Sequence, residues 1–344
     1  MFGYLRFVLA FLVLFSHVDV KFYGLNPGVI AVVMFYLLAG YVVSHLWENI
    51  IPQGRGKLYR FYKDRILRIL PLYCYVALLT LLFLVITGYA DPRFSLLRLA
   101  GNFLIIPLNY YMVADTTILT NPAWCLIPPA WSLGAELQAY LLLPLVLVNK
   151  NLKILLAAAS FGVYMLANLS VLNPDYFGYR LIFGIFFIFV AGSSIQISNK
   201  TKTSPAKTSS ARISPAKNRP QFEFDALYPW FLWGLIACLG LIFTSQKLFS
   251  PAYTRETFIG ILTGIPLICL FSRSRIKLPK NSFLGSLSYG VFLSHFLVIW
   301  CLDHTGLMNK NSMAYIPVIA MGSILIAGSG VKFIETGIDK IRKG

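Results

Sequence analysis

Long apolar runs make up most of the chain, and short polar segments separate them. A hydrocarbon core about 30 Å thick is crossed by about 20 helical residues, and windows of this length recur along the sequence. We predict ten transmembrane helices, at residues 2–20, 28–47, 66–87, 130–148, 153–172, 180–197, 228–246, 255–271, 284–302 and 314–334. The pattern therefore predicts an all-α fold, a polytopic membrane helix bundle.

A further apolar stretch, residues 96–113, is interrupted by Arg98, Asn102 and Asn109. It is either a span, or a re-entrant or interfacial segment. Counting it as a span reverses every later helix and places most basic residues outside, against the positive-inside rule. We therefore assign it to the outer side, within a segment at about 88–129.

The distribution of basic residues predicts the orientation. With ten spans and a cytoplasmic N-terminus, the outer side keeps only Lys21, Arg93, Arg98, Arg180, Lys247, Arg255 and Lys310. The remaining basic residues fall in cytoplasmic segments, so both termini are expected in the cytoplasm. One of these segments, 198–226, contains Ser-Pro-Ala-Lys twice, which is typical of a flexible basic loop.

Composition agrees with a membrane protein and excludes other classes. Of 344 residues, 57% are apolar and only 12% charged, whereas soluble domains carry about 25% charged residues. The chain is also too hydrophobic for a disordered protein. The net charge of +17 lies in short segments between apolar runs, which favours cytoplasmic loops beside a lipid bilayer over nucleic-acid binding.

The cysteines predict neither a disulfide framework nor a metal site. The five are Cys74, Cys125, Cys238, Cys269 and Cys301. They form no CxxC pair and no Cys/His cluster with metal-ligand spacing.

Ionisable side chains within spans are candidates for function, because the bilayer makes them costly. Arg6 and His17 are separated by eleven residues, or about 1100° of helical rotation, so they share one face about 16 Å apart. One face thus carries a cation and a titratable base. Alternatively, Arg6 reaches the headgroups and His17 lies in the outer interface.

A second candidate is Glu136, which follows Trp131 on the same predicted helix. Ser132, Glu136 and Tyr140 recur every four residues and form a polar stripe. A carboxylate in this position needs a partner, for which a His or Arg on another helix is suited. A purely structural ion pair is the alternative.

Three more basic residues complete the set. Arg65 and Arg68 share a face at the cytoplasmic end of the third predicted span. Their guanidinium groups match phosphates, either of a nucleotide-like donor or of lipid headgroups. His295 lies in the middle of the ninth predicted span, where no anchoring role accounts for it.

Together these segments resemble the acyltransferase-3 family of multi-span membrane O-acyltransferases, over residues 1–340. The resemblance rests on six motifs in chain order: Arg6 and His17; Phe35 to Tyr41, in which Ala39 replaces the usual Ser; Arg65 to Pro71; Trp131-Ser132-Leu133 with Glu136 and Tyr140; Ser288-Tyr289 with His295; and Phe333-Ile334-Glu335.

The resemblance implies an enzyme of the cell membrane (plasma or inner membrane). It moves an acyl group, usually acetyl, from acyl-CoA to a hydroxyl of a cell-surface carbohydrate or glycolipid. Acyl-CoA (acetyl-CoA) is then a donor substrate and no cofactor stays bound. The stand-alone form, without an extra esterase-like domain, is expected.

The same resemblance implies roles for the residues. His17 would be the general base, which suits an unperturbed histidine pKa of about 6.5, and Arg6 would help to keep it neutral. Glu136 would orient or charge-balance His17, while Arg65 and Arg68 would hold the CoA phosphates. An acceptor-contacting or supporting role is expected for His295, Trp131, Ser132 and Tyr140.

Two rival functions use the same residues. Intramembrane His, Glu and Arg also build the proton relays of proton-coupled transporters, but the chain lacks a corresponding pair of Gly/Pro-interrupted spans in its two halves. The second rival is a glycolipid-binding component without catalysis, in which His17→Ala would retain full function.

The orientation is tested by labelling single cysteines in a background without the native ones. Ser209→Cys is expected to react only from the cytoplasm and Asn311→Cys only from outside, because three predicted spans, an odd number, lie between the two positions. Reaction of both from the same side would overturn the ten-span topology.

Overall fold

The structure is a computed structural model that describes residues 1–203, 251–274 and 276–338. Its helices are α1 (Phe2–Ser16), α2 (Pro27–His45), α3 (Lys57–Thr87), α4 (Leu96–Leu104), α5 (Trp131–Val148), α6 (Lys150–Asn168), α7 (Ile182–Thr203), α9 (Thr254–Arg273), α10 (Asn281–Thr305) and α11 (Tyr315–Gly330). Strands β1 (Leu119–Thr120) and β2 (Ala123–Trp124) pair antiparallel. The short turns of helix are η1 (Leu46–Ile50), η2 (Ile106–Tyr110), η3 (Pro128–Ala130), η4 (Tyr176–Arg180) and η5 (Val331–Glu335).

The prediction of an all-α membrane bundle is confirmed. Within the described residues, eight helices are long and apolar enough to cross a membrane, and α1 is a shorter apolar helix. The predicted span at 228–246 lies outside the described residues, as does most of the 198–226 loop. The first residues assigned to that loop are helical, because α7 continues to Thr203.

Several helix boundaries differ from the prediction, most of all the start of α3. Helix α1 ends at Ser16, with His17 as its C-cap, instead of continuing to residue 20. The polar residues that follow form a turn in which Asp19 has a φ of 61°. Helix α3 begins at Lys57, after Gly56 in the left-handed conformation, instead of at residue 66. Its polar first turns carry too little apolar character for a hydropathy window to include them.

The segment at 96–113 does not form a span. Helix α4 is only nine residues long, and it ends where Ile105 adopts a φ of 65°. The buried Asn102 amide nitrogen donates to Arg98 O and Thr116 O, both at 2.8 Å, and its oxygen accepts from Leu126 N at 2.8 Å. The asparagine that interrupts the apolar pattern thus ties the outer segment together.

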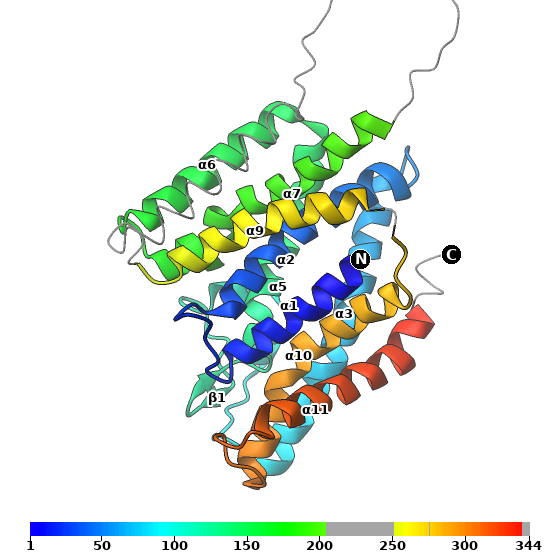
Figure 1. The fold of residues 1–344 in the computed structure, drawn as a ribbon. Coiled ribbons are helices and arrows are strands. Elements are labelled where there is room, and N and C mark those ends of the chain that lie inside the picture. The colour runs from blue at the N-terminus through cyan, green and yellow to red at the C-terminus, as the bar shows by residue number, and fades with distance from the viewer. Residues whose placement is uncertain (204–250, 275, 339–344) are drawn as a thin grey trace, which may run out of the picture.

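Helices α2 and α10 form the interior of the bundle. Helix α2 packs against α1, α7 and α9, while α10 packs against α1, α3 and α11. Figure 1 shows α6, α7 and α9 on one side and α10 and α11 on the other, with α1 and α2 between them. A helix that is apolar all round is suited to such a buried position.

Helices α2 and α7 approach each other at two glycines. A Cβ atom added to Gly40 would lie 1.9 Å from Phe189 O, and one added to Gly192 would lie 1.9 Å from Leu37 O. Both obstacles are backbone atoms, which cannot rotate away. Small residues at helix contacts are a common means of close packing in membranes, and here they place α2 at the centre.

We predict that Gly40→Ala lowers the free energy of unfolding by about 1–3 kcal/mol, since overpacking forces the two backbones apart. The matched control is Gly162→Ala in α6, where nothing lies within 4 Å of the added Cβ. Thermal unfolding of both variants in detergent measures the difference. Equal midpoints for the two would contradict the close α2–α7 contact.

Candidate active site

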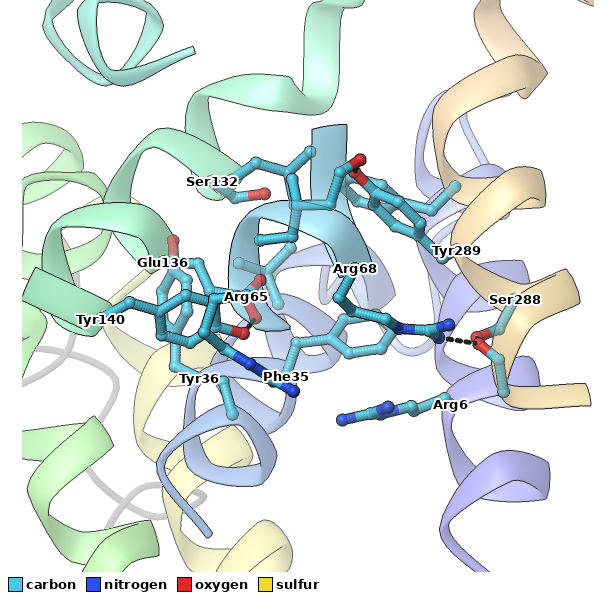
Figure 2. A pocket seen from close by; sticks show the side chains of 16 residues that line it. Arg6, Phe35, Tyr36, Arg65, Arg68, Ser132, Glu136, Tyr140, Ser288 and Tyr289 are labelled. Atoms are coloured by element: carbon cyan, nitrogen blue, oxygen red, sulfur yellow. Dashed lines mark hydrogen bonds between the residues drawn. The ribbon is translucent and has the colours of Figure 1, made fainter. Parts of the chain in front are cut away.

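A cavity of about 100 Å³ between α1, α2, α3, α5 and α10 collects most of the predicted site residues. We call it the arginine cavity, after Arg6, Arg65 and Arg68, which line it together with Glu136 (Figure 2). Helix α2 contributes one face to the wall, through Val32, Phe35, Tyr36 and Ala39. These positions follow the i, i+3, i+4, i+7 spacing of a single helical stripe.

The three arginines differ in their partners. Arg65 pairs with its neighbour Asp64, and its Nε donates to Asp64 Oδ2 at 3.0 Å. The Nη1 of Arg68 lies 3.1 Å from Glu335 Oε1 and 3.0 Å from Ser286 Oγ. Within the described part of the chain, Arg6 makes neither a hydrogen bond nor an ion pair, so it is the guanidinium with the most free donors.

Glu136 enters the arginine cavity from α5. Its Oε1 accepts a hydrogen bond from Tyr140, one turn further along, and the guanidinium carbon of Arg65 lies 5.6 Å from the centre of the Tyr140 ring. Ser132, Glu136 and Tyr140 all line the cavity. The predicted polar stripe therefore lines the same cavity as the arginines.

The predicted pairing of Glu136 with His17 is not found. Glu136 shares the cavity with Arg6, and eleven residues of α1, about 16 Å of helix, separate Arg6 from His17. The sequence places Arg6 and His17 on one face of α1. It does not indicate which of the two lies closer to Glu136 of α5.

A second, larger cavity of about 460 Å³ contains His17. We call it the histidine cavity. Besides His17 its wall includes one cation, Arg180, and the aromatic side chains Tyr111, Trp124, Trp131, Tyr179 and Tyr253. Trp131 thus belongs to this cavity, although its sequence neighbour Ser132 lines the other one.

His17 forms a stacked pair with His295. Their ring centres lie 5.3 Å apart, with an angle of 24° between the ring planes. His295 is fully buried, and its Nδ1 lies 3.2 Å from Val291 O. Because a carbonyl oxygen only accepts, Nδ1 is assigned the proton, and Nε2 is then an acceptor without a partner among the described residues.

His295 lines neither of these two cavities. It contacts the ring of His17, and His17 is the histidine whose side chain is exposed, in the histidine cavity. His295 thus contacts the other histidine, and its acceptor-contacting or supporting role stays a prediction.

The two cavities meet at Val32, the one residue of α2 that lines both. Sequence reasoning did not identify Val32, an ordinary apolar residue on an apolar helix, and it included Tyr36 only within the motif from Phe35 to Tyr41, without a role. It also missed Arg180, whose Nε donates to Asp175 Oδ1 at 2.8 Å and whose guanidinium carbon lies 4.5 Å from the centre of the Trp131 ring. The aromatic residues that precede Arg180 in the sequence could have indicated its position against aromatic rings.

The fold and the cavities define a multi-pass membrane protein with polar side chains enclosed by its helices. The chain belongs to the acyltransferase-3 family: it matches the family described as "Acyltransferase domain" over residues 2–330. It is therefore an enzyme that transfers acyl groups.

Two relatives are similar to parts of the chain. A protein of Aquifex aeolicus (strain VF5), described as "Uncharacterized protein", is 40% identical over 226 residues, which are 65% of this chain and 92% of that protein. "Protein 2 in picA locus" of Rhizobium radiobacter is 31% identical over 142 residues, 39% of this chain and 74% of that protein. No solved structure matches.

Proposed function

We propose that the enzyme transfers an acetyl group from acetyl-CoA to a hydroxyl of a cell-surface carbohydrate or lipid-linked sugar, in the plasma or inner membrane. The observation that supports this proposal is the meeting of the arginine cavity and the histidine cavity at Val32. An anionic donor and a hydroxyl acceptor then reach each other from two sides.

The arginine cavity suits the donor. Acyl-CoA carries several phosphate charges, and arginine forks bind phosphate oxygens through paired N–H groups. Arg6 offers a guanidinium without an ion pair among the described residues, and each of Arg65 and Arg68 has more donors than its carboxylate partner accepts. The basic cytoplasmic segment next to Arg65 agrees with a donor made inside the cell.

The histidine cavity suits a sugar acceptor. Its tyrosine and tryptophan side chains combine flat apolar faces with polar tips, and a sugar ring likewise presents apolar C–H groups and hydroxyls. The cavity is also several times larger than the arginine cavity, with room for at least one saccharide ring.

The chemistry requires a base on the acceptor side. His17 takes the proton of the acceptor hydroxyl as its oxygen attacks the thioester carbonyl. The new C–O bond forms, the C–S bond breaks, and the sulfur leaves as coenzyme A after it receives a proton, which His17 can return. Glu136, with Tyr140, balances the charge of the arginines, and His295 holds the His17 ring in place by stacking.

The function is tested with purified protein in vesicles, ¹⁴C-acetyl-CoA and a carbohydrate fraction from the cell envelope. We expect release of free thiol together with alkali-labile label on the carbohydrate, because an O-acetyl ester is cleaved by mild base. Binding of acetyl-CoA without thiol release or labelled carbohydrate would contradict the proposal.

Arg6→Ala is expected to weaken coenzyme A binding by about 1.5–3 kcal/mol, the contribution of a hydrogen bond to a charged group. Arg6 is chosen because the change breaks no ion pair, whereas Arg68→Ala, expected to weaken binding as well, also releases Glu335. The control is Arg93→Ala, an exposed residue outside both cavities. Calorimetric titration of the folded variants decides, and unchanged affinity in Arg6→Ala would remove Arg6 from the donor site.

His17→Ala is expected to lower turnover by about 10²–10⁴-fold, the usual contribution of a general base, while coenzyme A binding is retained. Wild-type activity should fall as the pH drops through the pKa of His17, because the protonated ring cannot accept a proton. His295→Phe keeps a stacking ring and should retain more turnover than His295→Ala. Near-normal turnover of His17→Ala would exclude the base role.

A further inference from the structure

Tyr36 lies where the two cavities adjoin. It follows Val32 by one helical turn, and both side chains line the arginine cavity. The Tyr36 ring packs against Phe189, with 4.9 Å between ring centres, and only 2% of the residue is exposed. Figure 2 shows Tyr36 in the same cavity as Glu136 and Tyr140. The residue is therefore a rigid part of the wall.

The surroundings of its hydroxyl come from both cavities. Tyr36 interacts electrostatically with Glu136, which lines the arginine cavity, and with Tyr179 and Arg180, which line the histidine cavity. Groups on either side of the boundary at Val32 therefore act electrostatically on the Tyr36 hydroxyl.

Tyr36 is the hydroxyl of this cavity that has no hydrogen-bond partner among the described residues. The others already donate to an acceptor of the protein: Ser132 to Pro129 O at 3.0 Å, Ser288 to Gly285 O at 2.8 Å, Tyr289 to Ile69 O at 3.1 Å, and Tyr140 to the Glu136 carboxylate. Buried polar groups are rarely left without a partner, because desolvation without a hydrogen bond is costly. A bound ligand is the partner that would remove this cost.

The charge of each donor without a protein partner indicates which part of the ligand it suits. Arg6 is a charged donor and suits a phosphate, whereas the tyrosine hydroxyl is neutral and suits a neutral carbonyl. With the donor phosphates at the arginines and the attacking hydroxyl beside His17, the thioester carbonyl lies between the cavities. Tyr36 is at that level of the bundle.

We infer that the Tyr36 hydroxyl donates a hydrogen bond to the carbonyl oxygen of the acyl group, an inference that rests on the proposed function. The carbonyl oxygen gains negative charge as the acceptor attacks, so a donor fixed in advance stabilises the transition state more than the bound donor. Tyr36 would then be a catalytic residue beside the base His17.

The first test compares the binding of acetyl-CoA and of coenzyme A, which lacks the carbonyl. Tyr36→Phe removes only the hydroxyl, so acetyl-CoA should bind about fivefold more weakly while coenzyme A binds as in the wild type. The control is Tyr41→Phe on the same helix, whose ring packs against Phe2 outside the cavity. Turnover of Tyr36→Phe at saturating donor should fall by about 10²-fold or more, as for the loss of one oxyanion donor.

The second test needs no variant. Infrared difference spectra of ¹³C-carbonyl acetyl-CoA bound to the wild type should show the thioester band at lower wavenumber than in an apolar solvent, because a hydrogen bond weakens the C=O bond. The shift should be lost in Tyr36→Phe and kept in Tyr41→Phe.

The outcomes separate the inference from the proposed function. If the wild type binds acetyl-CoA but its carbonyl band is unshifted, or if folded Tyr36→Phe matches the wild type in affinity and turnover, the role of Tyr36 is wrong and the acyl-CoA proposal stands. If the wild type binds neither acetyl-CoA nor coenzyme A, the proposed donor is wrong, and the role of Tyr36 falls with it.

Discussion

The structure depends on one constraint, that charged and polar groups enclosed by a membrane bundle must find partners within the protein. The arginine cavity meets it with local pairs and one long-range pair. Arg65 pairs with its neighbour Asp64, and Glu136 accepts from Tyr140 one turn along α5. Arg68 on α3 reaches Glu335 near the end of the described chain, which ties α3 to η5.

Helix α2 borders both the arginine cavity and the histidine cavity. Its glycine contact with α7 brings the backbones so close that no side chain separates them at Gly40, and the neighbouring stripe through Val32, Phe35, Tyr36 and Ala39 faces the arginine cavity. Val32 also lines the histidine cavity, so one residue of α2 borders both cavities. On the proposed function, the two ligands meet beside this residue.

The sequence predicted which residues matter better than how they meet. Arg6, Arg65, Arg68 and Glu136 were identified because a charge in an apolar run is costly, a signal that each residue carries by itself. The meeting of Glu136 with the arginines instead of His17 depends on how α5 lies against α1, which no spacing within either helix encodes. For the same reason the sequence does not reveal the stacking of His17 on His295. Tyr36 belonged to the motif from Phe35 to Tyr41 but received no role, because an aromatic residue is ordinary in a span.

Charge balance also explains why the three arginines are not equivalent. Around the cavity Arg6, Arg65 and Arg68 face three carboxylates, Asp64, Glu136 and Glu335, so the net formal charge of this group is close to zero and the bundle tolerates it at low dielectric. On the proposed function, an anion binds through N–H groups that the carboxylates leave free, not through excess charge. Since Asp64 and Glu335 each occupy one arginine directly, Arg6 contributes the largest share of these free donors, and it lies on the same helix face that leads to His17.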